Sequence, residues 1–199
     1  MDFKDRFRGF LPVVVDLETG GFDPERNPLL ELGCSMLDWD GGRLAVQSTH
    51  TWTVAPFSGC EVDPSSLKVT GIQLTEARGG VDEKVAMAEF FRMVRRAMKQ
   101  HHCHRAILVA HNVGFDAGFI RKVCERTGIR RSPFHPFSSI DSATLAAVAY
   151  GHTVLSEACK RAGLSFENAR AHSAAYDAER TAALFCEIVN GWPLDTTRW

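Results

Sequence analysis

The sequence predicts a mixed α/β fold, in which a β-sheet is covered by helices on both faces. Apolar runs without polar alternation at 11–18 and 105–112 are typical of strands that are buried on both sides. Two further strand-like segments, at 29–39 and 49–56, are joined by turn residues, as in a hairpin. Helical patterns then alternate with strands in the second half of the chain, which favours helices packed against a sheet.

The elements can be assigned in order along the chain. Asp40-Gly41-Gly42 is expected to form a hairpin turn, 57–81 a loop, and Gly128 the end of a helix. The expected elements are strands at 11–18, 29–39 and 49–56, a helix at about 82–100, a strand at 105–112, a helix at 113–126, a short strand at 138–141, and helices at about 142–149, 154–162 and 173–190.

Length and composition indicate one globular domain over residues 1–199. Apolar residues make up 45% of the chain and charged residues 24%, which is ordinary for a globular protein. No run approaches the roughly 18 to 20 apolar residues that a membrane span needs. The N-terminus has no apolar signal core, and the six cysteines form no C-x-x-C pair. We therefore expect a cytoplasmic protein without a membrane partner.

The net charge of −1 is unevenly distributed. Residues 92–131 contain ten basic and two acidic side chains, a net of +8, so the rest of the chain carries −9. Such a distribution can steer a polyanion towards an acidic site, although basic helix surfaces are also common without one.

Four carboxylates are predicted to meet at one edge of the sheet. Asp16 and Glu18 are two residues apart at the end of a buried strand, so they point to the same side. Asp116 heads an apolar helical stripe that continues at positions 120 and 123, and Asp177 heads another that continues at 181, 184 and 188. His172 precedes Ser173, a plausible N-cap for the helix that carries Asp177.

This set of residue types indicates metal-dependent phosphodiester chemistry. Four carboxylates balance the charge of two divalent cations, and hard oxygen ligands favour Mg²⁺, or Mn²⁺ in its place. Two such ions can clamp the attacking water and the leaving oxygen. His172 is then the candidate general base, because the unperturbed pKa of histidine is about 6.5.

Three motifs together resemble the DEDDh superfamily of 3′→5′ exonucleases. They are VDLETGGF (15–22), HNVGFDAGFI (111–120) and HSAAYDAERTAALF (172–185). With DRFRGF (5–10) and SPFHPF (132–137), nearly the whole chain is similar to the bacterial ribonuclease T family. The resemblance implies an RNase H-like mixed five-stranded sheet flanked by helices. It also implies trimming of the 3′ ends of tRNA and other small structured RNAs and of single-stranded DNA, with release of nucleoside monophosphates.

The same resemblance implies residues that hold the nucleic acid. A homodimer is expected, in which basic residues of one subunit contact the substrate of the other. The matching basic residues are Arg6, Arg8, Lys99, Arg105, Arg130 and Arg131, and the matching aromatic residues, which would stack on terminal bases, are Phe22, Phe115 and Phe137.

Two positions depart from the family pattern. Ser65 and Val69 stand where the family usually has an acid and a Phe. We therefore expect weaker discrimination against a 3′-terminal C. The sequence leaves three alternatives open: a polymerase-associated proofreading subunit, an oligoribonuclease, and a binding module without catalysis.

Overall fold

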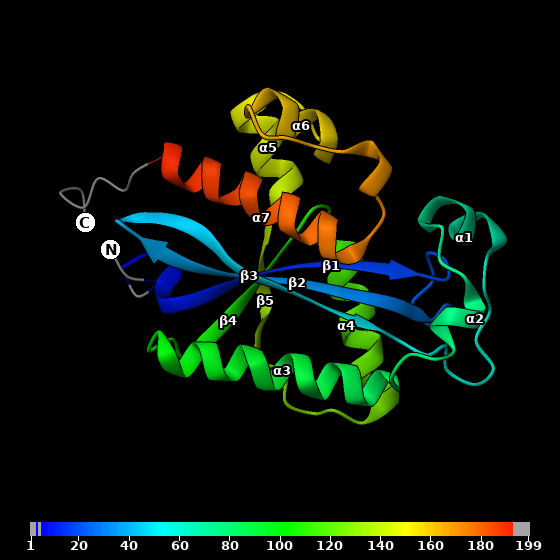
Figure 1. The fold of residues 1–199 in the computed structure, drawn as a ribbon. Helices are drawn as coiled ribbons and strands as arrows, with labels where there is room; N and C mark the ends of the chain where they lie inside the picture. Colours follow the sequence, from blue (N-terminus) through cyan, green and yellow to red (C-terminus); the bar gives the residue numbers. More distant parts are fainter. Residues whose placement is uncertain (1–2, 4, 193–199) are drawn as a thin grey trace.

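A mixed five-stranded sheet in the order β3-β2-β1-β4-β5 forms the centre of the structure, a computed structural model that describes residue 3 and residues 5–192 (Figure 1). β1 pairs antiparallel with β2 and parallel with β4. β2 pairs antiparallel with β3, and β4 pairs parallel with β5. The strands are β1 (Phe10–Thr19), β2 (Leu29–Asp40), β3 (Arg43–Thr53), β4 (Arg105–Ala110) and β5 (Phe134–Asp141).

Helices cover both faces of this sheet, as predicted. α7 (Ala174–Gly191) packs on β1, β2 and β3, with α5 (Ser142–Tyr150) and α6 (Leu155–Arg161) beside it. α3 (Glu83–Gln100) and α4 (Gly114–Thr127) lie on the opposite face (Figure 1). The short elements are η1 (Phe7–Gly9), α1 (Pro64–Thr70), α2 (Leu74–Ala77) and η2 (Asn168–Arg170). The mixed α/β prediction is therefore confirmed.

The central strand β1 is buried almost throughout. Phe90 and Phe119 pack from one face of the sheet and Phe185 from the other, and all three are fully or almost fully buried. None of the helices among the described residues has the length and apolar character of a membrane span. Of the predicted domain over 1–199, residues 1, 2, 4 and 193–199 lie outside the described residues.

The sheet topology places the predicted site. β1, β4 and β5 run parallel, so their carboxyl ends lie at one edge of the sheet. β1 reaches this edge with Glu18 and Thr19, β4 leads there into His111, and β5 ends there with Asp141. Sites in open α/β sheets form beyond such strand ends.

The third strand is longer than predicted. β3 begins at Arg43 rather than at 49 because Gly41 and Gly42 both adopt positive φ, 54° and 82°, and reverse the chain within two residues. Pairing therefore starts at once between Asp40 and Arg43. Asn190 at the end of α7 then exchanges hydrogen bonds with the backbone of Leu44.

The segment predicted as a loop contains two helices, and the fifth strand also begins earlier than predicted. Asp63 caps α1 by accepting from Ser65 N at 2.8 Å, and Pro64 occupies the first turn. None of the seven residues of α1 is buried, so no apolar stripe marks this helix in the sequence. β5 begins at Phe134 because an edge strand tolerates Pro136.

Candidate active site

Asp16 and Glu18 lie on the same side of β1, as their spacing predicts. Asp16 is half-buried and Glu18 is buried, and both are close to the carboxyl end of the strand. In the antiparallel ladder with β2, Asp16 stands opposite Gly33 and Glu18 opposite Glu31. The neighbouring strand β2 therefore has a glycine beside Asp16 and a further acid beside Glu18.

Gly33 allows the amino end of α7 to approach the sheet. A Cβ atom at this position would lie 2.0 Å from the backbone oxygen of Ala174, the first residue of α7. Only a glycine fits this approach without displacing the helix. The close contact brings the first turn of α7, with Asp177, next to β1.

Asp116 and Asp177 head buried helix faces, as predicted. Asp116 lies in the first turn of α4 together with the buried Ile120 and Val123 further along. Asp177 lies in the first turn of α7, and Thr181 continues its buried face. The four carboxylates thus come from one strand and two helices on opposite faces of the sheet.

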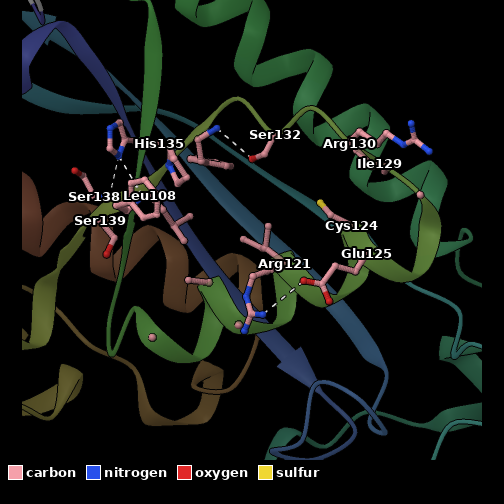
Figure 2. A pocket seen from close by; sticks show the side chains of 18 residues that line it. Leu108, Arg121, Cys124, Glu125, Ile129, Arg130, Ser132, His135, Ser138 and Ser139 are labelled. Atoms are coloured by element: carbon pink, nitrogen blue, oxygen red, sulfur yellow. Dashed lines mark hydrogen bonds and ion pairs between the residues drawn. The ribbon is translucent and has the colours of Figure 1, made fainter.

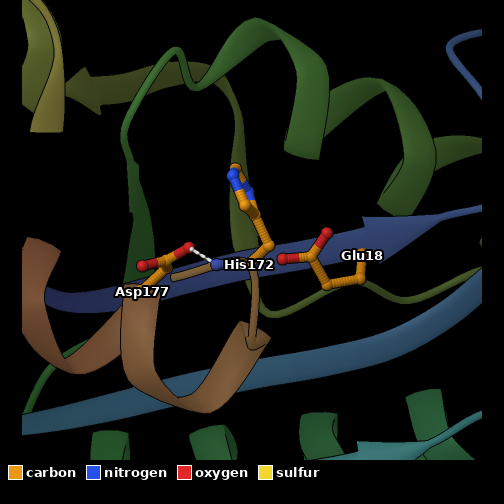
Figure 3. Close-up of side chains that lie close together, drawn as sticks. All are labelled: Glu18, His172 and Asp177. Carbon is orange, nitrogen blue, oxygen red and sulfur yellow. Dashed lines mark hydrogen bonds between the residues drawn. The ribbon is translucent and has the colours of Figure 1, made fainter. Parts of the chain in front are cut away.

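His172 lies beside Asp177 and Glu18 in a backbone conformation that is rare for a residue with a side chain. Its φ is 64°, and its N–H donates to Asp177 Oδ2 at 2.8 Å. A ligand atom from each of Glu18, His172 and Asp177 lies within 4.8 Å of the other two, so this group could hold a metal ion (Figure 3). The side chain of His172 is exposed, whereas the two carboxylates are buried.

The ionised form of these carboxylates is disfavoured, because the acids are buried close to one another. Burial, together with the charges of Asp177, Glu31 and Asp116, raises the pKa of Glu18 to about 8. Burial raises the pKa of Asp116 to about 8, and burial with the neighbouring acids raises the pKa of Asp16 well above its usual range. A divalent cation would remove this repulsion.

One oxygen of the cluster is left without a protein partner. Oδ1 of Asp177 is buried and finds no hydrogen-bond donor among the described residues. A buried carboxylate oxygen without a donor is costly unless a cation binds it. The acidic side chains therefore fit a divalent metal ion.

The sequence patterns missed two acids at the site. Glu31 stands opposite Glu18, and Asp141 accepts the N–H groups of Asn112 and Val113 and so fixes the approach to α4. Ser173 stands at the N-cap position of α7, as predicted, but its side chain makes no cap hydrogen bond among the described residues. Glu31 could not have been found locally, since only strand register brings it there.

A pocket adjoins the carboxylates and contains two of the predicted aromatic residues. Its volume is about 210 Å³, and Glu18, Phe22, Phe115, Ser65 and Val69 are among the residues that line it. The rings of Phe22 and Phe115 meet edge to face at 6.1 Å, and Phe22 is 80% exposed. The positions that depart from the family pattern therefore lie on α1, facing Glu18 and the two rings.

Phe137 lies elsewhere. It is 93% exposed, and it lines a separate groove of about 870 Å³ between α4 and β5 rather than the pocket of Phe22 and Phe115. Figure 2 shows this groove. Arg121, Arg130 and His135 also line this groove.

The six predicted basic residues are at the other end of the sheet. Arg6 and Arg8 precede β1, and Arg105 opens β4 opposite Phe10. Lys99 lies at the end of α3, and the remaining residues, Arg130 and Arg131, precede β5. These are the amino ends of the parallel strands, whereas the acids lie towards their carboxyl ends. The structure therefore does not bring these basic residues to the carboxylates of the same subunit.

Comparison with known proteins identifies the family. A family model described as an exonuclease, RNase_T, matches residues 13–185. The chain is 52% identical to ribonuclease T of Shewanella frigidimarina (strain NCIMB 400), with 96% of this chain and 90% of the relative covered. It is 53% identical to ribonuclease T of Marinobacter nauticus (strain ATCC 700491 / DSM 11845 / VT8), with 95% and 86% covered.

Solved structures show the same fold. E. coli exonuclease I in complex with a dT13 oligonucleotide matches with a TM-score of 0.68 at 19% identity, over 89% of this chain. A second structure of exonuclease I matches with a TM-score of 0.69 at 20% identity, over 90% of this chain. The chain spans about 40% of the length of exonuclease I in both comparisons. The RNase H-like fold is thereby confirmed, and the sequence relatives show that this chain belongs to the ribonuclease T family of 3′→5′ exonucleases.

Proposed function

We propose that the protein is a metal-dependent exoribonuclease that trims the 3′ ends of tRNA and other small structured RNAs. It also degrades single-stranded DNA from the 3′ end, and it releases nucleoside monophosphates. The observation that carries this proposal is the convergence of four carboxylates, one of them with a buried oxygen that lacks a donor among the described residues, beside an aromatic pocket.

Asp16, Glu18, Asp116 and Asp177 are the proposed metal ligands. They would hold two Mg²⁺ ions per subunit, with Mn²⁺ as a substitute, because their oxygen donors suit hard cations. Bound there, two ions supply charge stabilisation for the attacking and leaving oxygens of an in-line displacement. The raised pKa values of Glu18 and Asp116 support the proposal, since the site favours binding a cation or a proton.

His172 is the proposed general base. Its side chain is exposed at the edge of the carboxylates, while its backbone is held by Asp177. The imidazole would take the proton from the attacking water, and solvent access lets it pass that proton on.

Phe22 and Phe115 are proposed to stack on the terminal bases in the pocket next to Glu18, with Phe137 as a further stacking residue. Val69 and Ser65 line the same pocket, so weaker discrimination against a terminal C is expected of this chain. The names of the sequence relatives support RNA as substrate, and the oligonucleotide in exonuclease I supports a single-stranded DNA end.

The protein is further proposed to act as a cytoplasmic homodimer. Arg6, Arg8, Lys99, Arg105, Arg130 and Arg131 lie at the opposite end of the sheet from the carboxylates, so they would serve the site of the partner subunit. The cysteines at 34, 60, 103, 124, 159 and 186 are scattered and include no C-x-x-C pair, which suits a reducing compartment.

The decisive experiment measures the products from a tRNA with a 3′ overhang in Mg²⁺. Removal of one nucleotide at a time, stopping near the duplex, is expected, and internal cuts would exclude an exonuclease. The Asp116→Asn variant should be inactive but folded, and equal, metal-independent behaviour of the two proteins would end the proposal. A mismatched primer terminus and a dinucleotide in the same panel separate the proofreading and oligoribonuclease alternatives.

Mixed dimers test the partner arrangement. Subunits with Asp116→Asn are combined with subunits in which the six basic residues are replaced by Ala. Each population alone should be nearly inactive, and the mixture should regain activity because one intact active site then meets one intact basic surface. Activity of the charge-depleted subunits alone would contradict the arrangement.

A further inference from the structure

We propose that Glu31 is a positioning residue for the reaction, because it anchors the amino end of α7 and thereby sets where His172 and Asp177 stand relative to Glu18. This inference rests on the proposed roles of His172 and Asp177. Glu31 is not part of any of the three motifs, and its position depends on the pairing of β2 with β1.

Both oxygens of the Glu31 carboxylate are already bound by protein groups. Oε2 accepts the backbone N–H of Ala174 at 3.1 Å, and Oε1 accepts the hydroxyl of Thr51 on β3 at 3.1 Å. The side chain therefore connects β2 and β3 to the first residue of α7. Both oxygens thus accept hydrogen bonds that hold neighbouring elements together, and this is the role proposed for Glu31.

The helix needs this acceptor. The first N–H groups of any helix lack partners within the helix, and the Ser173 side chain makes no cap bond among the described residues. Glu31 supplies an acceptor instead, for the N–H of Ala174, the first residue of α7. Asp177 separately accepts the N–H of His172, which precedes the N-cap residue, at 2.8 Å. A negative charge at this end of α7 also complements the helix dipole.

Gly33 provides a second contact between β2 and the amino end of α7. It lies two residues after Glu31 on the same face of β2, and the helix backbone at Ala174 occupies the space of its missing side chain. Glu31 thus binds the N–H of Ala174 while Gly33 accommodates its C=O. Together, the hydrogen bond to Glu31 and the close approach at Gly33 fix the position of the first turn of α7 relative to the sheet.

The hydrogen bond from Ala174 N–H needs an acceptor oxygen at the right distance from the β2 backbone, but that oxygen does not have to carry a charge. The Glu31 charge itself opposes ionisation of its neighbours, since it contributes to the raised pKa values of Glu18 and Asp16. Glutamine keeps the reach and an acceptor oxygen but removes the charge. Aspartate keeps the charge but is one methylene shorter. The variants Glu31→Gln and Glu31→Asp therefore separate position from charge.

The experiment compares kcat and KM of full-length Glu31→Gln and Glu31→Asp on a single-stranded oligonucleotide in Mg²⁺. We expect Glu31→Gln to keep a kcat near that of the unmodified protein. Glu31→Asp should lose about 10- to 100-fold in kcat with KM unchanged, as for residues that orient metal ligands. Glu89→Ala is the matched control, because Glu89 on α3 also accepts a side-chain hydrogen bond, from Trp52 Nε1 at 3.0 Å, on the other face of the sheet.

The reverse pattern, in which Glu31→Gln loses activity and Glu31→Asp keeps it, would show that charge matters and would overturn the proposal. Equal activity of both variants, whether normal or reduced, would overturn it as well. Asp177→Asn is measured in parallel. If that variant is fully active, the proposed function fails, whereas an inactive Asp177→Asn beside a fully active Glu31→Asp refutes only the role of Glu31.

Discussion

The backbone N–H of His172 binds Oδ2 of Asp177 at 2.8 Å, while Oδ1 of the same carboxylate is buried without a donor among the described residues. One oxygen therefore holds the candidate base in place, and the other is available to a cation. This division also accounts for the φ of 64° at His172, because the bond to Asp177 offsets the cost of that backbone conformation. The candidate base and the candidate metal ligand are thus one structural unit.

Replacing His172 with Ala should lower kcat and leave folding intact. A general base contributes about 10²- to 10⁴-fold, and the exposed imidazole has no packing role to lose. The backbone bond to Asp177 does not need the side chain, so affinity for Mg²⁺ should persist. Single-turnover rates and a Mg²⁺ titration check this, and a loss of Mg²⁺ affinity with unchanged chemistry would instead assign His172 as a ligand.

The stability of the metal-free protein should fall as pH rises. Burial and neighbouring acids raise the pKa of Glu18 to about 8, above the 4.5 expected in the unfolded chain, and burial raises that of Asp116 to about 8. Between the pKa of each group in the unfolded chain and its raised pKa in the folded protein, the folded state binds more protons than the unfolded state. The free energy of unfolding therefore decreases as pH rises through this range. In EDTA the protein should be more stable at about pH 6 than at about pH 8.5.

Divalent cations should reverse this trend, because they replace the protons. The increase in Tm on adding Mg²⁺ should be larger at the higher pH. Glu18→Gln should show a flatter pH dependence in EDTA, and an unchanged slope in that variant would contradict the assignment.

Phe22→Ala should weaken substrate binding without destabilising the fold. Stacking on a base contributes about 1–3 kcal/mol, so KM for an oligonucleotide should rise accordingly. Phe22 is largely exposed in the pocket next to Glu18, so its removal creates no cavity. Val148→Ala on α5, another exposed apolar residue, is the control. A KM equal to that of the unmodified protein would remove Phe22 from the binding residues.

Val69→Phe should strengthen discrimination against a terminal C. Val69 is 58% exposed and lines the pocket with Phe22 and Phe115, so a larger ring can be accommodated there. Degradation of oligonucleotides that differ only in the last two bases measures the effect, with Ser65→Glu as a companion variant. Strong pausing at C in the unmodified protein would show that the family residues at these positions are not required.

Arg126→Met should destabilise the protein strongly. Arg126 pairs with Glu83, which is only 3% exposed, and it also donates to Pro24 O and stacks on Phe57. Removing one partner of such a pair costs about 3–5 kcal/mol, because the other charge remains buried.

Arg121→Met in the same helix is the control for Arg126→Met. Its pair with Glu125 is exposed, so the change should cost less than about 1 kcal/mol. Urea unfolding compares the two variants, and similar losses would contradict the importance of the buried pair.

Local patterns predicted most of the catalytic candidates. The i, i+2 spacing of Asp16 and Glu18 determines that they share a side of a strand, and Asp116 and Asp177 head apolar stripes that are set by the 3.6-residue helical repeat. The same patterns failed at 64–70, where α1 buries no side chain, and at 43–48, where a two-residue turn starts the pairing early.

By itself, the sequence determined the fold class, the four carboxylates and the histidine, because each depends on neighbours within a few residues. Only the tertiary structure decided that Glu31 and Gly33 dock α7, that α1 forms a wall of the aromatic pocket, and that the basic residues lie at the far end of the sheet. These relationships depend on strand register and helix packing. The physical reason is that contacts between distant segments form only when the whole core is assembled, so no local spacing records them.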